Sequence, residues 1–113
     1  MNFNDFSQDP QTTADNLKGW FIERTALTTA KIAEASGQVY YRQTADKFIE
    51  DNAYYALLDT IKETVKETNE ALDINMGSNK NGNLTGWAKF VFTTGLTHGI
   101  VKFAKKALEY SAK

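Results

Sequence analysis

Apolar residues are densest in residues 84–112, near the end of the chain. This segment has no proline, and its apolar positions recur at helical spacing. In its first half, Trp87, Phe90 and Phe92 fall within about one and a half turns and point nearly all round the axis. Helices that are apolar on every side are normally buried. The pattern therefore predicts a terminal helix that the rest of the chain, or a partner, surrounds.

The second half of the same segment is apolar on one side only. Lysines and a glutamate occupy the other side, and the predicted buried side consists of Ile100, Phe103, Ala107 and Tyr110. Gly95 and Gly99 stand four residues apart and, having no Cβ atoms, form a groove into which a second helix can settle. We expect this contact within the chain, with a partner interface and membrane insertion as the alternatives. The predicted interface residues are Trp87, Phe90, Phe92, Gly95, Gly99, Ile100 and Phe103.

Residues 10–35 form the first predicted helix. Asp9 can cap its free N–H groups, and Pro10 suits the first helical position because its missing N–H is not needed there. The predicted apolar face consists of Leu17, Trp20, Phe21 and Leu27. Farther along, Ala26, Ala30 and Ala33 share a side. They either permit close approach of another helix or simply reflect the high helix propensity of alanine.

Ser36 and Gly37 predict a turn, because glycine just past a helix end fits a left-handed cap. The alternative is one continuous rod, since a glycine inside a helix costs only about 1 kcal/mol. A short turn predicts that the first two helices are antiparallel neighbours.

Residues 38–73 contain neither glycine nor proline and form the second predicted helix. Tyr41, Phe48 and Tyr55 repeat every seven residues and predict a buried stripe. After a slip in phase the stripe continues with Leu58, Ile61, Val65 and Leu72. We interpret the tyrosines as core rings with hydrated hydroxyl groups. A nucleic-acid stacking surface needs a basic groove, and this helix is acidic.

Residues 73–83 are the predicted connector, since they contain two glycines and four asparagines. A calcium-binding loop starting at Asp73 is excluded, because Ser78 stands where such a loop needs glycine and Leu84 where it needs glutamate. We predict no metal site and no cofactor.

Composition fits one small domain with its own core. The 113 residues are 42% hydrophobic and include no cysteine, so disulfides and cysteine-based metal sites are excluded. We predict an all-α fold, an elongated bundle of three main helices over residues 10–35, 38–73 and 84–112, with a short N-terminal arm over residues 1–9. We find neither a signal peptide nor a clear transmembrane helix, and expect an intracellular or virion-associated location.

The net charge of −1 is unevenly distributed. Residues 1–83 hold 8 basic and 13 acidic residues, which gives −5, and residues 84–113 hold 5 lysines and one glutamate, which gives +4. The acidic and basic parts can attract each other within one chain or between copies, although solvated helix faces are the preferred explanation of the pattern. The basic tail has no arginine, and we do not expect nucleic-acid binding.

Catalytic signals are weak. His98 is the only histidine, and the nearest residues that could cooperate with it are threonines. We therefore expect no enzymatic activity and no small-molecule substrate. Our first hypothesis is a non-enzymatic interaction or assembly subunit, such as a structural component of an oligomer or a virus particle, whose partner is a protein, either itself or another subunit. The alternatives are a small acidic inhibitor or adaptor of another protein, and a peripheral membrane protein that uses the terminal helix.

Overall fold

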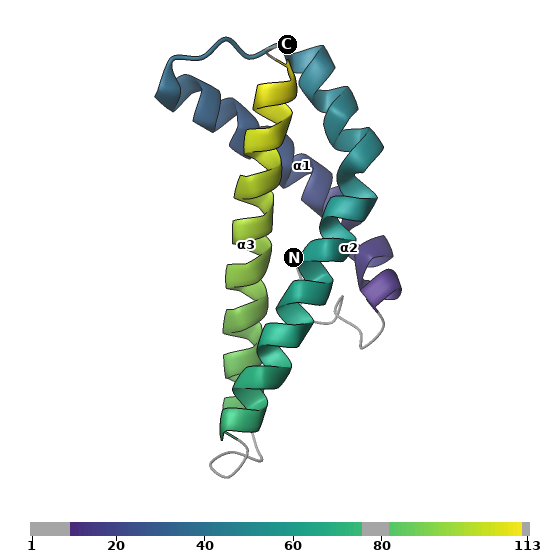
Figure 1. Ribbon diagram of the computed structural model, residues 1–113, viewed down its shortest axis with the longest axis vertical. Coiled ribbons are helices and arrows are strands. Elements are labelled where there is room, and N and C mark those ends of the chain that lie inside the picture. The colour runs from purple at the N-terminus through teal and green to yellow at the C-terminus, as the bar shows by residue number, and fades with distance from the viewer. Residues whose placement is uncertain (1–9, 76–81, 112–113) are drawn as a thin grey trace.

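The computed structural model contains three helices, α1 over Pro10–Ser36, α2 over Arg42–Asn75 and α3 over Gly82–Ser111 (Figure 1). It describes the backbone of residues 10–75 and 82–111, and the side chains of residues 10–67 and 93–111. No strand occurs in the described backbone. The molecule is elongated, with extents of 50 × 27 × 19 Å. The predicted all-α bundle of three main helices is confirmed, and the predicted arm over residues 1–9 lies outside the described residues.

Two of the helices run alongside each other, and the third crosses them. α2 and α3 are antiparallel neighbours along the long axis, whereas α1 crosses obliquely behind them (Figure 1). The first two helices are neighbours that run in opposite senses, as predicted, but they cross obliquely rather than lying alongside each other. The reason lies in the buried row of α1, which recurs every four residues: Thr13, Leu17, Phe21, Thr25, Thr29 and Ala33. Such a row is inclined to the helix axis, and helices packed through two such rows cross at about 50°.

α2 has a matching row, with the same spacing of four: Ala45, Ile49, Ala53, Leu57 and Ile61, each 0% exposed. The seven-residue part of the predicted stripe is wrong, because Tyr41 and Tyr55 are 54% and 69% exposed. Its continuation is confirmed at Ile61, which is buried, and at Leu58 and Val65, which pack partly against the core, whereas the side chain of Leu72 lies outside the described residues. Of that stripe's first three residues, Phe48 alone packs partly against the core. Two alanines in the actual row let a crossing helix come close, whereas tyrosines there would hold it away.

The break between α1 and α2 is a helix-terminating turn. Gly37 adopts a positive φ of 70°. The N–H of Gln38 donates to the carbonyl of Ala33 at 3.0 Å, and the N–H of Gly37 donates to that of Glu34 at 3.3 Å. These two bonds form a Schellman motif, which satisfies carbonyls that the end of a helix leaves free. The predicted turn is confirmed and the continuous rod is excluded, although α2 begins at Arg42, four residues later than predicted.

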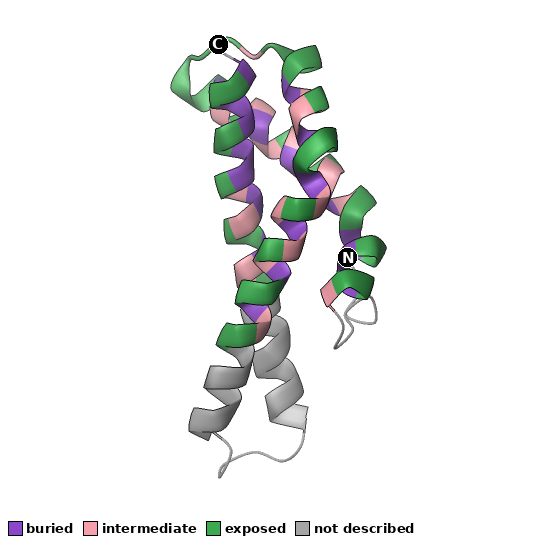
Figure 2. Cartoon of the chain, turned by 45° about the vertical axis from the view of Figure 1, so that its right-hand side comes forward, coloured by how far each residue is buried: buried purple, intermediate pink, exposed green. Residues whose placement is uncertain are grey.

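All three helices contribute to one core, and their buried sides face one another (Figure 2). The rings of Phe21 and Phe103 stack with centroids 5.8 Å apart, which ties α1 to α3. Phe48 of α2 lies 5.7 Å from Phe103 on the same measure. Phe103 thus lies at the centre of the aromatic core, and its predicted burial is confirmed, since it is 5% exposed. Two predicted core residues are wrong: Leu27 is 48% exposed, and Tyr110 is 51% exposed although its ring stacks on Phe48.

A candidate binding groove between α2 and α3

α2 lies close against α3 at the two glycines of α3. A Cβ atom added to Gly99 would lie 2.5 Å from both Cγ2 and Oγ1 of Thr60. One added to Gly95 would collide with Oγ1 of Thr64 and lie 3.1 Å from its Cγ2. Real Cβ atoms do not approach other atoms so closely, so a side chain at either position would force Thr60 or Thr64, or the helices themselves, to move. The close contact predicted from the two glycines is therefore made by α2, within the chain.

The two threonines that fill this space are held by their own helix. The Thr60 hydroxyl donates to the carbonyl of Ala56 at 2.8 Å, and the Thr64 hydroxyl donates to the carbonyl of Thr60 at 2.7 Å. These bonds satisfy the hydroxyl groups locally, as is common for threonine inside a helix. Each short side chain can then sit against a glycine of α3 without leaving its hydroxyl group unpaired.

An open groove of about 550 Å³ runs along this contact, and every described residue that lines it belongs to α2 or α3. The floor is made mostly of small residues: Ala56, Thr60, Thr64, Gly95, Gly99 and, at one end, Phe103. The α2 wall consists of Asp59, Glu63 and Glu67. The α3 wall consists of His98, Lys102 and Lys106. Residues in each wall are spaced by four and are exposed, so each wall is a row of side chains about one turn apart.

The charges of the two walls are not paired with each other. Within the described residues, the ion pairs are Arg42 with Asp46 at 3.9 Å and Lys47 with Asp51 at 3.7 Å, both inside α2. The six wall residues form none. The separation of an acidic front and a basic tail along the sequence thus becomes two opposed edges of one groove, open to groups from outside.

The structure separates the predicted interface residues into three sets. Gly95 and Gly99 form part of the groove floor, and Phe103 joins it from the core. Ile100 is 7% exposed and belongs to the core itself. The side chains of Trp87, Phe90 and Phe92 lie outside the described residues. Sequence reasoning missed the walls, although the spacing of four among the acids of α2 and among the basic residues of α3 was a signal that could have found them.

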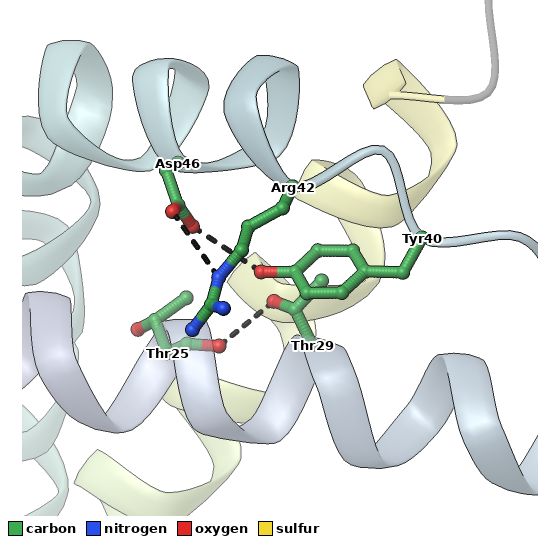
Figure 3. A network of polar contacts seen from close by, with 5 residues as sticks. All are labelled: Thr25, Thr29, Tyr40, Arg42 and Asp46. Carbon is green, nitrogen blue, oxygen red and sulfur yellow. Dashed lines mark hydrogen bonds and ion pairs between the residues drawn. The ribbon is translucent and has the colours of Figure 1, made fainter.

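A second polar cluster lies where the link between α1 and α2, residues 37–41, meets α2 (Figure 3). The Tyr40 hydroxyl donates to Oδ1 of Asp46 at 3.2 Å, and Arg42 pairs with the other carboxylate oxygen. Burial raises the pKa of Tyr40, the Asp46 charge and hydrogen bond raise it further, and Arg42 partly offsets them. These contacts hold the α1–α2 link against the first turns of α2, beside the second half of α1.

Two threonines of α1 lie under this cluster (Figure 3). Thr29 donates its hydroxyl to the carbonyl of Thr25 at 2.7 Å. The hydroxyl oxygen of Thr25 is buried and has no hydrogen-bond partner among the described residues. Leaving a buried polar group unpaired costs about 1–3 kcal/mol. The cluster therefore stabilises the junction of the helices, and the Thr25 hydroxyl beneath it remains without a hydrogen-bond partner among the described residues.

Other clues to function would be a metal site, a membrane span or similarity to known proteins. In the described parts of the chain, no three or more histidine and acidic side chains are grouped so that they could hold a metal ion. None of the helices, as far as their residues are described, combines the length and apolarity needed to cross a bilayer. No family model matches the chain, and neither a curated protein nor a solved structure matches it significantly.

Proposed function

We propose that this protein is a non-enzymatic interaction or assembly subunit, and that the groove between α2 and α3 is its contact surface for another protein. One observation carries the proposal: the groove has two walls of opposite charge whose side chains are unpaired within the described residues. Charges arranged in this way have no evident role in holding the bundle together. They are available to the complementary groups of a partner.

Charge, more than apolar area, would select the partner. The floor of the groove offers small residues, and its one large apolar side chain, Phe103, is 5% exposed. An exposed ion pair contributes about 0.2–1 kcal/mol, so each wall residue adds little alone. Complementary rows of charge nevertheless raise the association rate and exclude partners with the wrong pattern. We therefore expect a specific but modest affinity that falls as salt is added.

Contact is favoured over catalysis by the state of the polar groups in the groove. The hydroxyls of Thr60 and Thr64 already donate to backbone carbonyls. His98 and the acids of the α2 wall are exposed. Catalytic groups act best where water is excluded, because electrostatic interactions are strong there. His98 and the α2-wall acids are exposed to solvent, so they lack such surroundings.

The two other hypotheses from the sequence fit the groove less well. An acidic inhibitor or adaptor would present a surface of one sign, and a peripheral membrane protein would present a basic one. Here an acidic wall and a basic wall flank the same floor, so a uniformly charged target meets repulsion from one of them. We therefore place both hypotheses behind contact with a protein of mixed charge.

The test compares association by the wild type with association by two wall variants. Glu63→Lys gives the acidic wall a basic residue, and Lys102→Glu does the reverse. Complexes recovered from native cells, and solution mass at micromolar concentration, would be measured for each. Both variants are expected to lose the association that the wild type shows. Lys105→Glu, on the same helix but outside the groove lining, is the control.

Association that persists in both wall variants would place the contact elsewhere on the molecule. A wild type that neither associates with itself nor retains a partner would contradict the proposed function as a whole.

A further inference from the structure

Resting on the proposed function, the charge pattern of the groove also indicates the shape of the partner. We propose that the groove seats a single α-helix of another protein, with a basic edge along the α2 wall and an acidic edge along the α3 wall. The contact stripe of this helix, between its two edges, would consist of small residues. The partner helix would lie lengthwise along α2 and α3 as the fourth helix of the bundle.

The spacing of the walls favours a helix over an extended peptide. Asp59, Glu63 and Glu67 are each four residues apart, as are His98, Lys102 and Lys106. Side chains spaced by four along a helix recur about every 6 Å. Another helix alongside offers charges at the same interval if they too are spaced by four. In an extended strand, side chains on one face recur about every 6.7 Å, so their positions drift by roughly 1–2 Å over the two intervals of each wall.

The floor also fits the backbone of a helix. Gly95, Gly99 and Thr60 are half-buried, so part of each still faces the groove. Small residues on both sides let two helices approach closely, whereas bulky side chains on the partner would hold its edges away from the walls. The lining residues span 12 positions on α2 and 12 on α3, from Ala56 to Glu67 and from Gly95 to Lys106. This corresponds to about three turns of the partner helix.

A second copy of the chain fits less well than a separate helix. Two copies placed face to face match acidic wall with basic wall only if their two-fold axis runs parallel to α2 and α3. In that arrangement wall meets wall, and both grooves remain unfilled between the copies. Stable interfaces pack at the density of protein interiors, so this arrangement satisfies charge while it fails in shape. A single helix satisfies both.

The experiment uses three synthetic peptides and the full chain. Each peptide is a helix of about five turns, stapled on its outer face so that binding need not also fold it, with an alanine contact stripe. The first has one lysine edge and one glutamate edge. The second has the same composition, with both signs shuffled on each edge. The third is basic on both edges. Binding would be measured by fluorescence anisotropy at low and at high salt.

The wild type is expected to bind the first peptide at least about tenfold more tightly than either of the others, with a difference that shrinks at high salt. The double variant Lys102→Glu with Lys106→Glu makes both walls acidic, and its preference should change to the third peptide. Lys31→Glu with Lys105→Glu alters the net charge equally but lies outside the groove lining. This control pair should keep the wild-type preference, and far-ultraviolet CD should show both double variants folded.

Equal binding of the first two peptides, or a double variant that does not change its preference, would overturn the helix inference. Failure of the first peptide to bind the wild type would overturn it as well. If the wall variants abolish association in native cells but no peptide discriminates, the groove remains the contact surface and its occupant is not a helix. If they abolish self-association instead, the occupant is a second copy.

Discussion

The contact of α1 with the α2–α3 pair and the contact of α2 with α3 are built in opposite ways. α1 docks through side chains, with Leu17 and Phe21 fully buried. α2 meets α3 through the absence of side chains, at Gly95 and Gly99. The first contact fills the space between the helices with large side chains. The second brings backbones together over small residues and leaves an open channel above them. A bundle can therefore gain a binding surface by shortening side chains along one of its seams.

The two contacts should respond differently to mutation, and removal of a large side chain tests the first. Phe21→Ala is expected to lower the free energy of unfolding by about 3–5 kcal/mol. The Phe21 ring is fully buried and stacks on Phe103, so its loss leaves a cavity between α1 and α3. Urea unfolding followed by CD would measure the change. A loss below about 1 kcal/mol would show that α1 is not docked through this ring.

Addition of a single methyl group tests the second contact. Gly95→Ala is expected to destabilise the fold by about 1–3 kcal/mol, because its Cβ would collide with the buried side chain of Thr64. Gly99→Leu should be still more damaging, since its larger side chain would meet Thr60. The same chemical denaturation would measure both.

Gly19 supplies a matched control for the glycines of α3. It lies inside α1, and a Cβ there would meet nothing within 4 Å. Gly19→Ala should therefore stabilise the fold by up to about 1 kcal/mol through helix propensity alone. Opposite signs at Gly19 and Gly95 would separate packing from propensity. The same sign at both would mean that the seam between α2 and α3 is looser than described.

The buried hydroxyl of Thr25 on α1 allows a substitution that should stabilise the fold. Thr25→Val keeps the shape of the side chain and removes a buried oxygen that has no partner among the described residues. We expect it to raise the free energy of unfolding by about 1 kcal/mol. Thr29→Val removes a hydroxyl that is hydrogen-bonded to its own helix, and it should gain less. Loss of stability in Thr25→Val would show that the oxygen is satisfied after all.

The smallest expected effect concerns alkaline pH. The pKa of Tyr40 is raised above its usual value of 10.0 by burial and by Asp46. The folded state therefore favours the neutral phenol, and the resulting stability is present below about pH 10 and lost as the pH rises through the higher folded-state pKa. Tyr40→Phe should lose stability less steeply above pH 10 than the wild type. Parallel curves in pH-dependent thermal melts would contradict this role for Tyr40.

The fold was predictable because its main signals are local. Gly37 ends a helix whatever it packs against, and long stretches free of proline and glycine leave few alternatives to helix. The buried faces were harder to predict. A seven-residue repeat is present at Tyr41, Phe48 and Tyr55. The row that starts at Ala45 is buried instead, because α1 crosses α2 obliquely. No local sequence pattern predicts that crossing angle.

The sequence predicted the glycines in the floor of the groove but not its charged walls. Gly95 and Gly99 are informative alone, because a helix that accepts two glycines usually needs the space. Charged residues such as Glu63 and Lys102 carry no such information, since most charges on a helix simply face water. They became meaningful only when two distant segments were found to line the same floor.

The charge walls also contribute an electric dipole directed across the groove. With a net charge of only −1, a protein with evenly mixed charges would be held weakly by any ion exchanger near neutral pH. Here one edge of the groove is cationic and the other anionic, so the molecule can rotate to present either edge to a charged surface. It should be retarded on both cation and anion exchangers at low ionic strength, and sodium chloride should release it from each.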